Sequence, residues 1–354
     1  MSSRNERFEY RLATPADSPR ILEIMESGDF SGKISVLYTR RPDPVQSLMR
    51  EGDQVIIPVM MDRDNGRMCG VGCCVIRSAW LNGELKKTGY LSGLKIHPDY
   101  QRRLPHVARA YETFYQESGG LVDLFYTTIL KENLMAQRLL EKRRKGMPAY
   151  RMVGEYTVYC FRTGVKRKQN VSGFRVEQGN MTGVMAFYAD QLKKANVAPA
   201  GINLPGLSEH DIYTLRDGTG QIFAACGLWN QQSDKQYIIT GYGGLYRILK
   251  HIPLKLLGYP NLPAENIPAN YASIALLCVK DHQPEWAQHL INHVAGKAIA
   301  YDFLMAGLFE NHPLEAVFYQ MKHIKYQSRV YTVHWEDDPP PLDGRPVHLE
   351  VGLL

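Results

Sequence analysis

The 354-residue sequence lacks the segments that place a protein in a membrane or outside the cell. No apolar run approaches the length that spans a bilayer, and the first residues, MSSRNERFEYRL, contain no apolar core of a signal peptide. The six cysteines form no CxxC pair and lie mostly in apolar runs, which predicts buried thiols rather than disulfides or a zinc site. We therefore expect a cytoplasmic protein with no membrane partner.

A strong excess of charge is also missing. The formal net charge of +6 is small for this length and evenly spread, so nucleic acid is not expected as a partner, although an anionic cofactor would suit it. Glu285, His289 and His293 are spaced four apart, as helical metal ligands can be. Because the apolar face of that segment lies around Leu290 and Ile291, we expect the histidines on a solvated face, and no metal.

The first part of the chain reads as a strand, a helix and then three adjacent antiparallel strands over residues 54–96. Asn65-Gly66 and Asn82-Gly83 separate these strands, and Asn-Gly between strand-like runs is a strong hairpin signal. Periodicity then predicts a helix over 105–117, a buried strand over 121–130, a helix over 133–145 and a strand over 155–162.

The second part of the chain repeats this order of elements, from a hairpin over 221–244 to a closing strand over 329–335. The repetition predicts a duplicated α+β (mixed α/β) fold with two tandem domains, each a mixed, mostly antiparallel sheet flanked by helices. We expect the domains to cover residues 1–164 and 165–336. The tail, 337–354, follows a proline break and is expected to add an edge strand.

An apolar and basic insert, GLYRILKHIPLKLLGYPNLP (244–263), interrupts the second part. It could cover a cleft, mediate dimerisation or contact a membrane surface. Since Pro253 breaks its pattern and it carries few charges, the expectation is a packed insert.

The stretch HPDYQRRLPHVARA (97–110) joins a predicted strand to a predicted helix through a turn without glycine. The start of a helix exposes backbone N–H groups and the positive end of its dipole, which together attract a pyrophosphate. Loops that bind phosphate in this way usually contain glycine, for positive φ and for close approach of the ligand. Arg102 and Arg103 supply positive charge here, and Pro105 suits the first helical turn.

This stretch and its surroundings resemble the GCN5-related N-acetyltransferase (GNAT) superfamily. The resemblance rests on GYLSGLKIHPDYQRR, the amphipathic helix and buried strand after it, and ENLMAQRLLEKRRKG, and it covers nearly the whole first part. It implies two GNAT-like units in tandem, of which the second is degenerate because KDHQPEW replaces the basic loop there. The positions that match the family's patterns are Ile96, Pro98, Gln101, Asn133, Ala136 and Leu139.

The resemblance implies acetyl-CoA as the co-substrate. In that family, a strand that splays from its neighbour holds the pantetheine arm and polarises the acetyl carbonyl with backbone groups, and the following helix start holds the pyrophosphate. The cofactor-binding residues implied are Leu94, Lys95, Ile96, Gln101, Arg102, Arg103, Leu104, His106, Val107 and Asn133.

The sequence departs from the family at functional positions. Leu104 and His106 replace the two loop glycines, so we expect weakened rather than lost pyrophosphate binding. Leu140 stands where the family often has a tyrosine that acts as general acid, and Tyr90 where many members have a glutamate named as general base. Tyr90 is therefore the candidate catalytic residue, with a core or cleft-wall tyrosine as the alternative.

The function implied is an acetyl-CoA-dependent N-acetyltransferase whose acceptor is the amine of a small molecule or peptide. The alternative is a non-catalytic GNAT-fold protein that binds acyl-CoA or acts as a scaffold. The second unit would shape the acceptor site or an interface, and a homodimer is possible. The acceptor itself stays open, because acceptor residues lie on variable loops.

Overall fold

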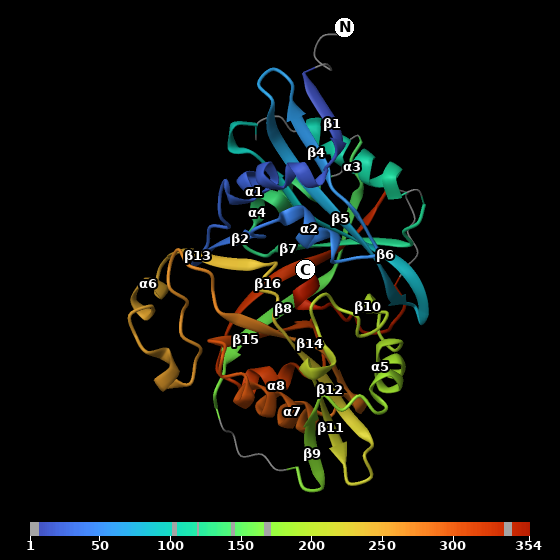
Figure 1. Cartoon of the computed structure of the whole chain (residues 1–354), viewed down its shortest axis with the longest axis vertical. Helices are drawn as coiled ribbons and strands as arrows, with labels where there is room; N and C mark the ends of the chain where they lie inside the picture. Colours follow the sequence, from blue (N-terminus) through green and yellow to red (C-terminus); the bar gives the residue numbers. More distant parts are fainter. Residues whose placement is uncertain (1–6, 101–104, 119, 143–145, 166–170, 336–341) are drawn as a thin grey trace.

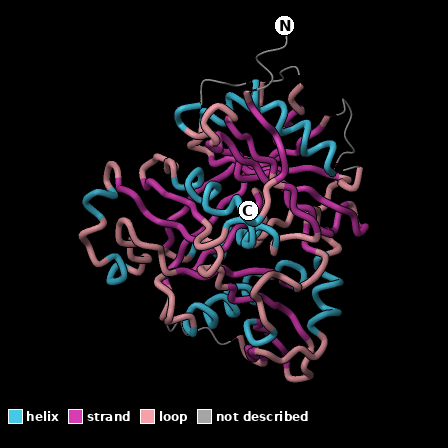
Figure 2. The backbone as a smooth tube through the Cα atoms, turned by 45° about the horizontal axis from the view of Figure 1, so that its top comes forward, coloured by secondary structure: helices cyan, strands magenta, loops and turns pink. Residues whose placement is uncertain are grey.

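The computed structural model describes residues 7–100, 105–118, 120–142, 146–165, 171–335 and 342–354. Within these residues a 14-stranded mixed sheet runs through the molecule, and the helices lie outside it (Figures 1 and 2). A separate two-stranded sheet lies beside it. The mixed α/β architecture predicted from the sequence is confirmed.

The first half of the chain forms the predicted antiparallel strands over residues 54–96, except that the first of the three is divided into two short strands, 54–56 and 58–62, which both pair with the second. At the second hairpin Asn82 and Gly83 have φ angles of +51° and +81°, the left-handed conformation that a type I′ turn requires at both central positions. The elements are β1 (Phe8–Leu12), α1 (Ser18–Glu26), β2 (Ile34–Thr39), α2 (Pro44–Met49), β3 (Gln54–Ile56), β4 (Pro58–Asp62), β5 (Arg67–Leu81), β6 (Glu84–Ile96), α3 (Pro105–Ser118), β7 (Leu124–Leu130), α4 (Leu134–Leu140) and β8 (Ala149–Arg162).

The second half contains one strand that pairs differently from the prediction. The strand at 236–242 was expected to form a hairpin with the strand at 222–229, but it leaves the large sheet and pairs antiparallel with β2 of the first half. The elements are β9 (Phe174–Gln178), α5 (Val184–Leu192), β10 (Ala198–Pro199), β11 (Ile212–Asp217), β12 (Ile222–Trp229), β13 (Gln236–Tyr242), α6 (Tyr246–Leu249), β14 (Tyr271–Val279), α7 (Pro284–Lys297), β15 (Phe303–Phe309), α8 (Glu315–Gln320) and β16 (His323–His334).

The strand order shows that the two halves repeat each other. Along the large sheet the order is β1-β4-β5-β6-β7-β16-β8-β15-β14-β12-β11-β9. Read from either end, four strands are followed by a fifth that pairs in parallel with the fourth, namely β7 with β6 and β15 with β14. The other neighbours on this path pair antiparallel.

The closing strands of the two halves are exchanged. The sequence pattern predicted a closing strand at the end of each half without saying which strand it pairs with. In the structure β8 of the first half pairs with β15, and β16 of the second half pairs with β7. The two closing strands also pair with each other antiparallel, from His323–Phe161 to His334–Ala149. This pairing joins the halves into one sheet and leaves no sheet edge at the junction.

Helices cover both faces of the sheet in each half. Neighbouring residues on a strand point to opposite faces. Cys74 packs with Val107 and Phe114 of α3, whereas Cys73 packs with Ile21 of α1, so α1 and α3 lie on opposite faces. The same alternation separates α5 from α7, because Ala225 packs with the first of these helices and Ala224 with the second.

The C-terminal segment lies in the middle of the molecule, between the halves (Figure 1). Val347, Leu349 and Val351 are buried in a hydrophobic cluster that contains residues of both halves. Instead of the expected edge strand, residues 342–354 form one isolated bridge, between Val347 and Asn196, and a short 3₁₀ turn at Val351–Leu353. Of the helices described, none is both long and apolar enough to cross a membrane.

Candidate functional site

The two parallel strands of the first half diverge partway along their length. β6 and β7 are paired from Thr88–Leu124 to Tyr90–Tyr126. Beyond this point β6 continues along β5 and β7 along β16. The Thr127 hydroxyl donates a hydrogen bond to the Leu91 carbonyl oxygen at 2.6 Å, just where the strands part. The later part of β6 therefore presents one backbone edge to the opening.

A bulge in β6 lies at this opening. The register steps from Cys73–Ser92 to Val71–Lys95, so between these pairs two residues of β6, 93 and 94, lie opposite one residue of β5. A bulge of this kind takes backbone groups out of the ladder and re-aims them. Gly93, the exposed residue inside the bulge, has φ of +62°. A Cβ atom there would approach only the Cys73 Cβ, at 3.8 Å, so the backbone conformation and not space favours glycine.

The predicted cofactor residues on β6 follow this bulge. Leu94 and Ile96 are partly buried and pack against the cluster that includes Val107 of α3. The Lys95 side chain turns toward the end of α1, where its Nζ donates to the carbonyl oxygens of Met25 and Gly28, both at 2.6 Å. Burial lowers the pKa of Lys95. The Lys95 side chain thus anchors α1, and what this stretch offers a ligand is its backbone.

The predicted phosphate loop lies largely outside the described residues. This applies to Gln101, Arg102, Arg103 and Leu104, and also to the side chain of His106. The structure does show that a helix, α3, begins at Pro105, directly after the loop and beyond the end of β6. A shallow, mainly apolar hollow adjoins this start; its lining residues include Leu94, Lys95, Ile96, Val107 and Ala110.

Tyr90 occupies the last position at which β6 pairs with β7. Its side chain is 5% exposed, and its hydroxyl lies 2.8 Å from Thr128 Oγ1. The centre of its ring lies 5.0 Å from the centre of the Tyr126 ring. Burial raises the pKa of Tyr90 well above its ordinary value, so the phenol stays protonated at neutral pH. Tyr90 is therefore a buried core tyrosine, the alternative to a catalytic role, and it also lies where β6 and β7 begin to diverge.

Two positions of the later sequence pattern lie in and beside α4. The Asn133 side chain accepts a hydrogen bond from the backbone N–H of Ala136 at 3.1 Å, which makes Asn133 the N-cap of the helix. Leu140, where the family often has a tyrosine, is buried in the cluster between α3 and the sheet.

A buried ion cluster that sequence reasoning missed lies where the halves meet. Glu51 Oε1 is 2.9 Å from Arg40 Nη2 and 2.6 Å from Lys235 Nζ, and all three side chains are less than 10% exposed. Burial lowers the pKa of Lys235 to about 8. Burial opposes ionisation of Glu51, but the charges of Lys235 and Arg40 outweigh it and hold its pKa at about 2. Lys235 lies far along the sequence from Arg40 and Glu51, and no motif connects the three.

The second half contains a matching pair of diverging strands. β14 and β15 pair in parallel only from Tyr271–Phe303 to Ser273–Met305. The register of β14 against β12 then steps from Gly227–Ala275 to Ala225–Cys278, so two residues of β14, 276 and 277, lie opposite one residue of β12. Leu276, the first residue of this bulge, has φ of +53°. Leu276 therefore corresponds to Gly93.

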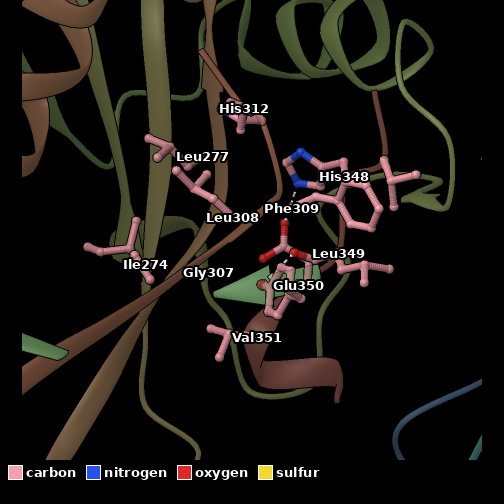
Figure 3. Close-up of a pocket in the computed structure, with 13 residues that line it drawn as sticks. Ile274, Leu277, Gly307, Leu308, Phe309, His312, His348, Leu349, Glu350 and Val351 are labelled. Atoms are coloured by element: carbon pink, nitrogen blue, oxygen red, sulfur yellow. Dashed lines mark hydrogen bonds and ion pairs between the residues drawn. The ribbon is translucent and has the colours of Figure 1, made fainter. Parts of the chain in front are cut away.

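This second opening is filled by the chain itself. The backbone N–H of Leu276 donates to Glu350 Oε1 at 2.9 Å, and the Tyr156 hydroxyl donates to the Leu349 carbonyl oxygen at 2.8 Å. His348 Nε2 lies 2.7 Å from Glu350 Oε1, and Figure 3 shows the two side chains directed toward each other. Leu277 of β14 and Leu308 of β15 line the same small pocket. The tail segment 347–351 thus lies in the opening between β14 and β15.

In the part of the chain that the structure describes, no group of three or more His, Cys, Asp or Glu side chains is arranged to hold a metal ion.

Comparison with known proteins gives structural matches alone. No family model and no curated protein sequence matches the chain. A GCN5-related N-acetyltransferase from Sphaerobacter thermophilus is 10% identical with a TM-score of 0.56, and the match covers 97% of this chain and 99% of that one. The N-myristoyltransferase of Saccharomyces cerevisiae, solved with bound myristoyl-CoA, is 9% identical with a TM-score of 0.58, covering 97% and 90%.

A further match is part of a larger protein. It is the GCN5-related glucosamine N-acetyltransferase region of a fungal multi-domain GH3 β-N-acetylglucosaminidase, with 13% identity and a TM-score of 0.60. The match covers 92% of this chain, which spans only 38% of that protein.

Proposed function

We propose that this chain, which has the fold of the GCN5-related N-acetyltransferases, is an acyl-CoA-dependent N-acyltransferase. The donor would bind between β6 and β7, with its pyrophosphate at the start of α3. Acetyl-CoA is the donor that the sequence resemblance implies. The acceptor would be the amine of a small molecule or a peptide.

The observation that carries this proposal is the correspondence of the two bulges. In the second half, the bulge N–H of Leu276 holds a carboxylate oxygen of Glu350. The corresponding residue of the first half, Gly93, is exposed. We infer that the N–H of Gly93 donates to the carbonyl oxygen of the thioester, which gains negative charge as the amine attacks.

The reaction forms a C–N bond and breaks the C–S bond of the thioester. The amine loses a proton, and coenzyme A leaves as the thiol once its sulfur is protonated. Tyr90, which stays protonated at neutral pH, suits a hydrogen-bond donor near the leaving sulfur better than a general base. An amine acceptor needs little more than a positioned water to lose its proton.

Calorimetric titration with acetyl-CoA and longer acyl-CoAs tests the binding part of this proposal. We expect one acyl-CoA per chain, because the second opening is filled by residues 347–351. Replacing both loop arginines, Arg102→Ala with Arg103→Ala, should weaken binding about tenfold or more through loss of charged hydrogen bonds. Arg20→Ala, an exposed arginine on α1, is the matched control. No binding at millimolar ligand would overturn the proposal.

The second candidate function is a non-catalytic acyl-CoA-binding or scaffold protein. It is favoured by Leu140, a core residue that cannot act as general acid, and by the burial of Tyr90. Release of free coenzyme A thiol with a panel of amines separates the two functions. Turnover that depends on the amine would exclude the scaffold, whereas binding without turnover across the panel would favour it.

A further inference from the structure

The insert at 244–263 is not the packed segment that its sequence suggested. It forms α6, a short 3₁₀ turn at Leu254–Leu257 and connecting loops on one side of the molecule, beside β13 (Figure 1). Its large apolar side chains mostly face solvent. Those between 37% and 84% exposed, together with one just beyond the insert, are Leu245, Ile248, Ile252, Leu256, Leu257, Tyr259 and Ile267.

The insert is nevertheless fixed to the body of the protein. Leu254 is buried, and Arg162 Nη1 donates to the Lys255 carbonyl oxygen at 2.6 Å. The Tyr242 hydroxyl donates to the Pro263 carbonyl oxygen, also at 2.6 Å. The exposed apolar side chains therefore stand on an anchored base. Single exposed apolar side chains are common on protein surfaces, but this many on one short segment indicate an interaction surface.

The charge of this surface is positive. Residues 244–263 contain Arg247, Lys250 and Lys255 and no acidic residue. Glu265, which lies just before Ile267, pairs with Lys250 at 3.0 Å, and both side chains are partly buried. Lys255 lies 3.5 Å from Asp302 at the exposed surface, where such a pair is weak. Lys322, whose Nζ donates to the Leu257 carbonyl oxygen at 2.8 Å, adds a further positive charge beside the turn.

We propose that the insert, residues 244–263, docks the protein onto the surface of an anionic phospholipid membrane. Aliphatic side chains enter the boundary between headgroups and acyl chains, and neighbouring basic residues attract the lipid phosphates. Tyr259 has the amphipathic ring that suits this depth. The positive charge distinguishes this surface from a purely apolar protein interface. The proposal rests on the insert alone and is independent of the acyltransferase proposal.

Sedimentation of the full chain with vesicles tests this proposal. We expect binding to vesicles of phosphatidylcholine with phosphatidylserine, weaker binding at high salt, and little binding to pure phosphatidylcholine. The double variant Ile248→Glu with Leu257→Glu should lower the partition coefficient at least about tenfold. Arg247→Gln should lower it about fivefold, the effect of one basic charge at an anionic surface.

The matched control is Met185→Glu on α5, across the molecule from α6 (Figure 1). Met185 and Leu257 are both 54% exposed, so the control matches one of the two substitutions in charge and exposure, and it should bind vesicles like the unchanged protein. Absence of sedimentation with either vesicle, or equal binding by the double variant, would overturn the proposal. So would a dimer, seen by analytical ultracentrifugation, that only the double variant abolishes, since the surface would then be an interface between copies of this chain.

Discussion

At the scale of single residues, the cluster of Glu51, Arg40 and Lys235 is the most consequential buried feature. Removing charges from water is unfavourable, and a buried ion pair is held by the mutual attraction of its members. The cluster connects the segments before and after α2 with the segment before β13, so it joins the two halves. Losing the single carboxylate would leave Arg40 and Lys235 buried, with Arg77 beside them, without their anionic partner.

We predict that stability falls in acid because of Glu51. Its pKa is lowered from 4.5 to about 2 in the folded protein. A carboxylate with a depressed pKa contributes stability that is fully present above its unfolded pKa and is lost as pH falls through the folded one. The contribution of Glu51 should therefore disappear between about pH 4.5 and pH 2. Urea unfolding at pH 7 and pH 3 measures the change.

The substitution Glu51→Gln should lower the unfolding free energy at pH 7 by about 3–5 kcal/mol and flatten the acid response. Asp53→Asn is the matched control, because the Asp53 carboxylate pairs with Lys87 at the exposed surface, where such a pair contributes less than about 1 kcal/mol. Equal losses for the two variants would show that the cluster has no special role.

At the scale of elements, local sequence signals predicted the strands and helices but not every partner. Asn82-Gly83 specifies its hairpin through backbone conformation, and the apolar spacing from Val107 to Phe114 specifies α3. Nothing local specifies that β13 pairs with β2, since both strands are short and apolar. The candidate site was likewise only partly predicted. The sequence motif pointed to positions 94–96, but the bulge at Gly93 and its counterpart in the second half, which the tail fills, could be recognised only in the structure.

We predict that the tail is held between β14 and β15 by Glu350. Glu350→Ala would leave the buried N–H of Leu276 without its acceptor, at a cost of about 1–3 kcal/mol. Glu350→Gln keeps an acceptor oxygen at that position and should lose less. Thermal unfolding of both variants makes the comparison, and an alanine variant as stable as the glutamine variant would contradict the prediction.

At the scale of the whole molecule, the repeated order of elements revealed the duplication but not the exchange of closing strands. β8 and β16 have similar apolar, aromatic-rich patterns, so the sequence alone does not say which strand closes which half. The choice depends on pairing that extends over the full length of both strands.

We predict that neither half forms a stable monomer alone. Residues 1–164 expressed separately would expose the edge of β7 that β16 covers, and would aggregate or associate through it. Coexpression with residues 165–354 should restore a soluble 1:1 complex, detected by size-exclusion chromatography. A monomeric 1–164 fragment with a cooperative thermal transition would contradict this.

Because the closing strands are exchanged, the first half cannot complete its part of the sheet until the second half has been synthesised. β7 leaves the ribosome long before β16, so the opening between β6 and β7 lacks its neighbouring wall until most of the chain has been translated. Early-terminated products, even those that contain every residue of the proposed donor site, would lack a finished site. Only chains translated beyond β16 would therefore have a complete donor site. Shorter chains would expose the unpaired edge of β7, which chaperones and proteases could bind.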